Sequence, residues 1–298
     1  MLEEVASLGF THMELSHGVR VSLVPGILKA VEAGLVRIGS CHNFCPLPPG
    51  VLHASPNLYQ PSSLDQREID QWVRHTKRSI DFARLVGAGV LVCHLGSVAF
   101  WFFNPAQRLQ RYMERNPKGD YREDKGFIKR RDAGLRRMRK AGKPHLTRLH
   151  DSLKLVLEYA AEKGILLGFE NRENFDELPL DEGFDALFAA MPEGAPVGYW
   201  HDCGHADLKE KMGLLDHRSH LEKHSQRLIG FHLHDVSAEG KDHQEVGSGR
   251  VDFEMLTAHW RPGQRFVLEL SPRLKTEQVL RSKEKVEQLL ARISSSWR

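Results

Sequence analysis

One unit recurs along the 298-residue chain: an amphipathic helical pattern, a glycine near its end, and a short apolar run that stops at polar residues. The longer examples lead through Gly87 to VLVCHLG and through Gly164 to ILLGFEN. Glycine just past a helix supplies a left-handed cap, and short apolar runs are typical of parallel strands buried on both faces. The alternation therefore predicts β/α units with right-handed connections around a parallel sheet.

Seven strands are expected, at HMEL, VRIGSCHN, VLVCHLG, ILLGFEN, YWHDCGH, IGFHLHD and FVLEL. A closed α/β barrel has eight, and this chain begins at the helix expected after a first strand. The predicted fold is a (β/α)8-type TIM barrel whose first strand is apparently missing from the chain. A doubly wound open sheet is the structural alternative. Ligand-type residues at nearly every strand end favour the barrel, because an open sheet gathers its site at one switch point.

Two segments interrupt the repeat, and both are candidate lids over a pocket. Residues 46–65 are rich in Pro and Ser, and residues 97–145 form a long insertion after the strand ending at His94. Residues 108–143 hold 14 Lys and Arg against five acidic residues, a local charge of +9 in a chain of +3. We expect one domain over residues 1–298, with a basic insertion that is a solvated lid, an oligomer contact or an attractor of anionic substrates.

Composition limits the function classes. The chain has no apolar run of 18 residues, and its acidic N-terminus is unlike a signal peptide. Its four cysteines are too few and too irregular for a disulfide framework or a zinc ribbon. These observations predict a cytoplasmic protein without membrane association, and they leave a homo-oligomer open.

Four apolar runs end at side chains that bind metals: Glu170, Asp202, His232 and Glu269. Each residue alone is explained as well by a helix N-cap or a surface group. Together they supply three carboxylates and one imidazole from four separate strands, with room for substrate in an open coordination position. The set predicts one divalent ion, best Mn²⁺ or Zn²⁺, while Mg²⁺ and Co²⁺ are also compatible.

Four histidines border this set: His42, His94, His205 and His243. Each is a candidate to bind substrate, to ligate an additional ion or to orient a ligand, and His205 is favoured for substrate or metal contact. Arg172 shares the strand side of Glu170, so it is a candidate to bind a substrate hydroxyl, carboxylate or phosphate, and a salt bridge is the other explanation.

Three further histidines are interpreted by position. His234 shares the inward side of His232, because alternate side chains of a strand point the same way. His220 and His224 lie in a polar helical stretch. We expect these last two to be solvated.

The chain resembles the xylose isomerase-like superfamily of TIM barrels from residue 1 to about 290. The resemblance is carried by GFTHMEL, HLG after a strand, ILLGFENRE, WHDCGHA, GFHLHD with its continuation GKDHQEVGSGRVDF, and VLEL. Their order and spacing are specific for the superfamily and not for one reaction. The resemblance to the epimerase branch implies that Glu170, Asp202, His232 and Glu269 are metal ligands and that His205 touches the substrate.

That resemblance predicts a divalent-metal-dependent isomerase or epimerase acting on a sugar, a sugar phosphate or a related polyol. A cation that coordinates a carbonyl and its neighbouring hydroxyl stabilises the enediolate formed when the α proton leaves. In the epimerase branch the two metal-bound glutamates move this proton from opposite faces, which implies Glu170 and Glu269 as the acid/base pair.

Other functions compete with this one. A dehydratase of an inosose or sugar acid needs the same metal and base. An apurinic endonuclease of the endonuclease IV type uses three metals, and the four bordering histidines stand where that pattern places ligands, while basic residues suit DNA phosphates. That pattern wants a carboxylate two residues before the loop histidine, where this chain has Lys241, with Asp242 shifted by one. Nucleic acid is therefore the less expected partner. A scaffold barrel would have lost some of the ligands.

Overall fold

The protein is described by a computed structural model that covers residues 2–294. The chain divides into two compact units, which are described separately. The first unit contains the chain up to Val98 together with Gly142–Glu170 and Ala186–Gly198. The second contains Ala99–Ala141, Asn171–Asp185 and the chain from Tyr199 onward.

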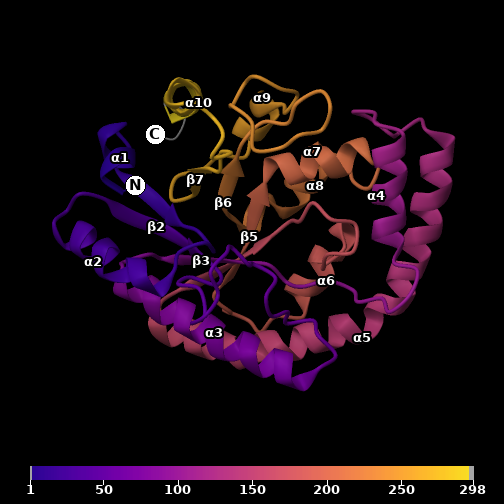
Figure 1. Cartoon of the computed structure of the whole chain (residues 1–298), viewed down its shortest axis with the longest axis horizontal. Coiled ribbons are helices and arrows are strands. Elements are labelled where there is room, and N and C mark those ends of the chain that lie inside the picture. The colour runs from indigo at the N-terminus through magenta and orange to yellow at the C-terminus, as the bar shows by residue number, and fades with distance from the viewer. Residues whose placement is uncertain (1, 295–298) are drawn as a thin grey trace. The chain divides into compact units, whose positions relative to one another are not determined.

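Seven strands occur among the described residues, as predicted. They are β1 (His12–Leu15), β2 (Arg37–His42), β3 (Val90–Cys93), β4 (Leu166–Glu170), β5 (Val197–Asp202), β6 (Leu228–Leu233) and β7 (Arg265–Leu268). Strand order follows chain order, and the registered pairs are parallel. At least one helix separates each strand from the next among the described residues (Figure 1). This pattern confirms the predicted α/β fold of the TIM-barrel type.

The helices match the predicted periodic segments in most places. They are α1 (Leu2–Ser7), α2 (Val24–Glu32), α3 (Gln66–Leu85), α4 (Pro105–Arg115), α5 (Lys125–Lys163), α6 (Phe184–Ala189), α7 (Cys203–Lys211), α8 (His217–His224), α9 (Phe253–Thr257) and α10 (Thr276–Ser294). Short 3₁₀ turns cover Val21–Leu23, Asp181–Gly183 and Ser225–Arg227. Within residues 2–294, none of the helices combines the length and the apolar character that crossing a membrane requires.

In the first unit, β3 forms the centre of the core, with its four residues at most 1% exposed. Helix α3 starts at Asp65, whose carboxylate caps it by accepting from the backbone N–H of Arg67. The later part of α5 runs beside α3 in Figure 1, and the Tyr159 hydroxyl on α5 donates to Asp81 on α3 at 2.6 Å. These contacts fix the helices that flank the ends of β2, β3 and β4.

The last part of the basic insertion is helical, and it is continuous with the helix expected after residue 145. Both form α5, which runs through Pro144 to Lys163. The basic segment is rich in good helix formers such as Lys, Arg, Leu, Met and Ala, which favour its helical conformation. In the second unit α4 lies beside the start of α5 (Figure 1), where the Tyr112 hydroxyl donates to Asp124 at 2.9 Å.

Large aromatic side chains on and beside β5 and β6 form the core of the second unit. Trp200, Phe231 and Trp260 are fully buried. Gly230 on β6 faces the Trp200 ring so closely that an added Cβ would lie 2.3 Å from a ring carbon. Only glycine fits there, and the tight packing holds the carboxyl ends of β5 and β6 in register, with Asp202 paired to His232.

Candidate functional site

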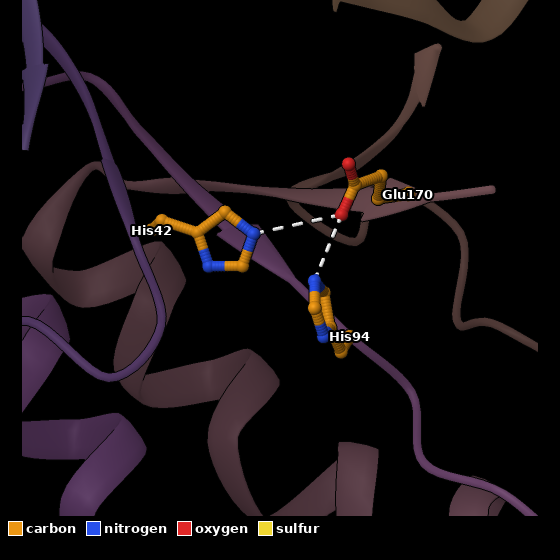
Figure 2. A group of neighbouring side chains, drawn as sticks. All are labelled: His42, His94 and Glu170. Atoms are coloured by element: carbon orange, nitrogen blue, oxygen red, sulfur yellow. Dashed lines mark ion pairs between the residues drawn. The ribbon is translucent and has the colours of Figure 1, made fainter. Parts of the chain in front are cut away.

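In the first unit, His42, His94 and Glu170 form a buried cluster at the ends of β2, β3 and β4 (Figure 2). The Nε2 atoms of His42 and His94 lie 3.5 and 3.0 Å from the same Glu170 oxygen. The three residues are between 1% and 6% exposed. Strand ends therefore gather these side chains, as the sequence predicted for a barrel-type fold.

The partners of the other ring nitrogens fix the orientation of both histidine rings. His42 Nδ1 lies 3.0 Å from the backbone oxygen of Asn43, and His94 Nδ1 lies 2.9 Å from Asn57 Oδ1. Both partners only accept hydrogen bonds, so each Nδ1 carries a hydrogen and each Nε2 faces the same Glu170 oxygen. That arrangement calls for a proton or a cation, and it matches histidines that ligate a metal while donating their other N–H to an oxygen.

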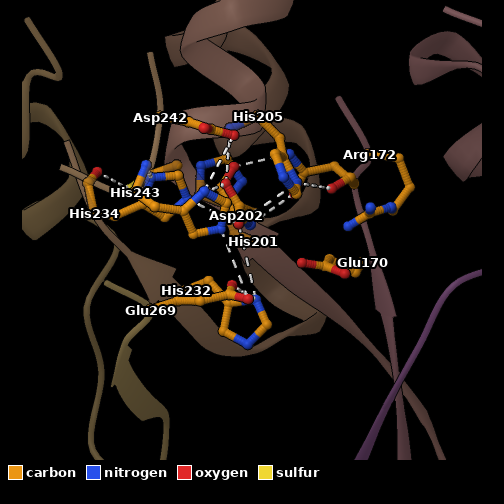
Figure 3. Close-up of polar contacts among 12 residues, drawn as sticks. Glu170, Arg172, His201, Asp202, His205, His232, His234, Asp242, His243 and Glu269 are labelled. Carbon is orange, nitrogen blue, oxygen red and sulfur yellow. Dashed lines mark hydrogen bonds and ion pairs between the residues drawn. The ribbon is translucent and has the colours of Figure 1, made fainter. Parts of the chain in front are cut away.

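In the second unit, Asp202, His232 and Glu269 converge from β5, β6 and the end of β7 (Figure 3). His232 Nδ1 lies 2.9 Å from Glu269 Oε2 and 3.8 Å from Asp202 Oδ2. Asp202 and His232 are fully buried, whereas the Glu269 side chain is 32% exposed. Glu269 is thus the member of this group that contacts solvent.

Asp202 also caps α7, because its Oδ1 accepts from the backbone N–H of His205 at 2.7 Å. The N-cap explanation weighed from the sequence is therefore correct and coexists with the ligand-type cluster. The His205 ring places Nδ1 3.1 Å from the backbone oxygen of Asn171 and 3.4 Å from Asp202 Oδ2. The Asn171 side chain makes two hydrogen bonds to the backbone of Asp202. Its Oδ1 accepts from the Asp202 N–H and its Nδ2 donates to the Asp202 carbonyl, each at 2.8 Å.

His234 has a larger part than its sequence position suggested. Its Nε2 lies 3.0 Å from Asp202 Oδ1, and its Nδ1 accepts from the backbone N–H of His243 at 2.9 Å. The second contact requires the tautomer with hydrogen on Nε2, so His234 donates to Asp202 and orients that carboxylate. Gly204 packs against the ring so closely that an added Cβ would lie 2.1 Å from it. The signal in the sequence was the alternate spacing of His232 and His234.

The loop after β6 is organised by one buried carboxylate. Asp235 accepts hydrogen bonds from the backbone N–H groups of Val236, Gly247, Gly249 and Val251, at 2.8 to 3.0 Å. These bonds clamp both ends of residues 236–251, the loop that contains Asp242 and His243. Sequence reasoning missed Asp235 because it lies on the strand side opposite His232 and His234.

His243 lies between two acidic side chains. Its Nδ1 is 3.2 Å from Asp242 Oδ2, and its Nε2 is 3.8 Å from Glu269 Oε1. Burial opposes protonation, but hydrogen bonding to Asp242 and Glu269 outweighs it and raises the pKa of His243 to about 11. The Lys241 side chain is exposed, whereas Asp242 turns toward His205 (Figure 3). The sequence argument against nucleic acid was that Lys241 stands where a carboxylate is wanted. It is weakened, because Asp242 presents its carboxylate to His205 instead.

Arg172 makes the salt bridge that was one of its two explanations, with Nε 3.1 Å from Glu177 Oε1. The next residue, Glu173, was not singled out in the sequence. Its carboxylate groups with His205 and Asp242, with one ligand atom from each lying within 4.8 Å of the others. The substrate roles of Arg172 and of the bordering histidines stay predictions.

The expectation for α8 was wrong. His220 and His224 are buried, at 8% and 3% exposure, and His220 Nε2 lies 3.0 Å from the Tyr199 hydroxyl. His217 is buried as well, and its Nε2 atom lies 2.9 Å from the Nε2 atom of His201. Burial is the main cause that lowers the pKa of His217 to about 4 and that of His220 to about 3.

The predicted ligands fall in both units. Asp202, His232 and Glu269 come together in the second, while Glu170 lies with His42 and His94 in the first. The four-ligand set and the identity of its metal therefore stay predictions. What the geometry adds is that both groups have donor types suited to a divalent cation.

No protein-family model matches the chain, and no curated protein matches its sequence. Several solved structures are similar to it. A D-tagatose 3-epimerase-like protein shares 17% identity over 99% of this chain and 93% of its own, with a TM-score of 0.68. A xylose isomerase domain protein from Planctomyces limnophilus shares 15% sequence identity over 99% of this chain and 93% of its own, with a TM-score of 0.65. An L-ribulose 3-epimerase shares 12% sequence identity over 99% of this chain and 90% of its own, with a TM-score of 0.67. The likeness confirms the α/β fold of the TIM-barrel type.

Proposed function

We propose that the protein is a divalent-metal-dependent isomerase or epimerase of a sugar, a sugar phosphate or a related polyol. The observation that carries the proposal is the position of His232 Nδ1, 2.9 Å from Glu269 and 3.8 Å from Asp202. Two carboxylates and an imidazole from neighbouring strand ends are a donor set for Mn²⁺ or Zn²⁺. Solved structures with the same fold include sugar epimerases, which supports this substrate class.

In the proposed site, Glu170 at the end of β4 is the fourth ligand. The bound ion supplies Lewis-acid polarisation of a substrate carbonyl and its neighbouring hydroxyl. Glu170 and Glu269 form the acid/base pair, one carboxylate taking the α proton and the other returning a proton to the opposite face. The buried His234 donates to Asp202 and keeps that ligand oriented. His205 and Arg172 are the proposed contacts to substrate hydroxyl or anionic groups.

Metal content is the first test. Protein purified without chelator is expected to carry Mn²⁺ or Zn²⁺, measured by elemental analysis. Asp202→Asn keeps an N-cap oxygen for α7 but removes the charge, so it is expected to lose the ion. Asp252→Asn is the matched control, because Asp252 caps α9 in the same way and is exposed. A wild-type protein that holds no metal, and takes up none when it is added, contradicts the proposal.

Reaction type is the second test. The metal-loaded protein is incubated in deuterated water with ketoses, inososes and sugar acids, and exchange of the α hydrogen is followed by mass spectrometry. Isomerisation or epimerisation predicts deuterium in substrate and product with no loss of water. Loss of water from an inosose or sugar acid would assign the dehydratase instead. The cytoplasmic location and a homo-oligomeric state stay predictions.

Phosphodiester cleavage at abasic DNA is the second candidate. The orientation of His42 and His94 toward Glu170 favours it, because this group suits an additional metal. The lysine at position 241, where the endonuclease pattern has a carboxylate, weighs less against this function because its side chain is exposed. The basic insertion suits DNA phosphates. Incision of a duplex with one abasic site, together with close to three Zn²⁺ per chain, would favour this function over sugar isomerisation.

A further inference from the structure

Three consecutive aromatic residues of the second unit, Trp101, Phe102 and Phe103, lie on its surface. They are 95%, 75% and 74% exposed. Phe103 also has a left-handed backbone, with φ of 57°, which is unfavourable for a bulky residue. Contiguous exposed apolar side chains of this size mark interaction surfaces, and a strained conformation that is kept points to a use for it. We call residues 101–103 the aromatic tip.

The aromatic tip is held from both sides by the rest of the second unit. The Arg137 guanidinium on α5 donates to the backbone oxygen of Phe102 at 2.9 Å, and its central carbon lies 5.0 Å from the centre of the Phe100 ring. On the other side, Asn104 caps α4 and donates from Nδ2 to Asp176 at 2.9 Å. These contacts use the backbone and the neighbours of the tip, so they leave its three rings facing solvent.

Basic side chains flank the aromatic tip on the two helices of the insertion. Residues at helical spacing share one face of a helix. On this spacing α4 and α5 each carry a basic stripe, Arg108, Arg111 and Arg115 on the first and Lys129, Arg136 and Lys140 on the second. All six are exposed, and none of them forms an ion pair within residues 2–294. Pro105, at the start of α4, packs against α5 at Gly134, where an added Cβ would lie 3.3 Å from Pro105 Cβ. The tip therefore adjoins both stripes.

We propose that the aromatic tip and the two basic stripes dock on an anionic phospholipid surface. Trp and Phe side chains insert at the boundary between head groups and acyl chains, and nearby Lys and Arg are attracted to anionic head groups. Either signal alone gives only marginal binding, and here the two adjoin. Charge complementarity selects this partner, because a second copy of the same face would bring like charges together.

The exposure of the tip favours a lipid surface over a nucleic acid. Bases stack on aromatic rings that line a basic groove. Trp101, at 95% exposure, stands clear of neighbouring side chains, as an anchor that inserts into a soft surface does. Such a contact needs neither a spanning helix nor a signal peptide. The expectation of a protein without membrane association rested on those two features, so it does not bear on this surface. The proposal does not depend on the isomerase assignment.

The test is sedimentation of the full-length protein with vesicles of phosphatidylcholine alone or in equal parts with phosphatidylserine. The wild type is expected to bind the anionic vesicles at least about tenfold more tightly than the neutral ones, and to lose affinity as salt is raised. Replacing the tip by Trp101→Ser, Phe102→Ser and Phe103→Asn together is expected to weaken binding by about tenfold or more. The three positions are exposed and Asn tolerates the left-handed backbone, so this variant should fold.

Charge is tested separately from apolar contact. Arg108→Gln with Arg136→Gln removes one charge from each basic stripe, and it is expected to weaken binding to anionic vesicles by about 20-fold, roughly fivefold for each charge. Arg74→Gln with Arg84→Gln is the matched control, because it removes two exposed arginines from α3 in the first unit. Leu52→Ser, which removes a side chain from a residue that is 66% exposed, is the control for the tip. Both controls are expected to bind within about twofold of the wild type.

Trp101 also reports its own insertion. Its fluorescence emission is expected to move to shorter wavelength on anionic vesicles and to be quenched by brominated acyl chains. The difference between the wild type and Trp101→Phe, which keeps an apolar ring, isolates this emission from the other tryptophans. Absence of wild-type binding to anionic vesicles, or equal binding by the wild type and the tip variant, would overturn the proposal. Self-association without lipid that the tip variant loses would overturn it in favour of a second copy, and tip-dependent binding of a single-stranded oligonucleotide in preference to vesicles would do so in favour of nucleic acid.

Discussion

Two sets of buried histidines in the second unit behave in opposite ways. His232 and His234 turn a ring nitrogen toward a carboxylate, Glu269 in one case and Asp202 in the other. His217 and His220 turn their rings toward His201 and Tyr199, with no carboxylate at hydrogen-bond distance among the contacts described. Burial lowers the pKa of His217 to about 4 and that of His220 to about 3.

The difference shows that burial alone does not make a histidine a ligand. Desolvation disfavours the charged imidazolium, and only a nearby carboxylate reverses that preference. In the first set, His232 therefore lies where it can share a cation with two carboxylates, while His234 donates to Asp202 and orients that carboxylate. The second set is kept neutral and serves to pack and hydrogen-bond α8 against β5. The two sets should respond differently to substitution, pH and metal.

The largest effect is expected from Glu269→Gln, which removes the proposed proton carrier beside His232. The rate of α-hydrogen exchange with an accepted sugar should fall by about 10² to 10⁴, the range for a general acid or base. Exchange is measured in deuterated water with saturating metal. His220→Gln belongs to the second set and should leave the rate within about threefold. Unchanged exchange in Glu269→Gln would remove this glutamate from the acid/base pair.

Asp235→Asn should have the next largest effect, through the loop that holds Asp242 and His243. An amide has only one acceptor oxygen, so its NH₂ group faces two of the four backbone N–H donors. We expect the free energy of unfolding to fall by about 3 kcal/mol, measured by urea denaturation. Asp242→Asn makes no such backbone contacts and should cost less than about 1 kcal/mol. Similar losses in both variants would show that the loop is not clamped by Asp235.

The parts predicted correctly from the sequence depend on local signals. Strand-like apolar runs, their order and the ligand-type residues at their ends are all readable in a short window, and the seven strands and the fold follow from them. Asp202 and His232 come together because adjacent parallel strands end at one edge.

The parts that were missed depend on packing at a distance. The sequence of α8, HRSHLEKH, looks polar on every side, and its histidines are buried only because Tyr199 and His201 on β5 supply partners. Asp242, and not Lys241, turns toward His205. This depends on the hydrogen bonds by which Asp235 holds the loop and on the left-handed backbone of His243, with φ of 54°. No spacing rule in the sequence contains that information.

The pH dependence of stability should come from the second set of histidines. The pKa of His217 is about 4 in the folded protein and about 6.5 when unfolded. Below pH 6.5 the unfolded chain binds a proton that the folded protein does not, so stability falls as the pH drops toward 4. His217 should contribute about 2 kcal/mol of this loss between pH 6.5 and 5.

The measurement is urea denaturation across this pH range with chelator present, which removes any contribution from metal binding. His217→Gln should be less stable at pH 7 but should lose less stability on acidification than the wild type. Equal slopes for the two proteins would mean that His217 is protonated in the folded state. That result would place it with the carboxylate-facing set.

Tyr199→Phe should have the smallest effect, and it tests whether the two sets are independent. The Tyr199 hydroxyl lies 3.0 Å from both His201 Nδ1 and His220 Nε2, and it donates to Asn171 Oδ1 at 3.1 Å. Loss of the hydroxyl should lower the free energy of unfolding by about 1 to 2 kcal/mol. Asn171 keeps both bonds to the Asp202 backbone, so Mn²⁺ affinity should change by less than about threefold. A much larger loss of affinity would show that the neutral histidines help to position Asp202, and that the two sets act as one network.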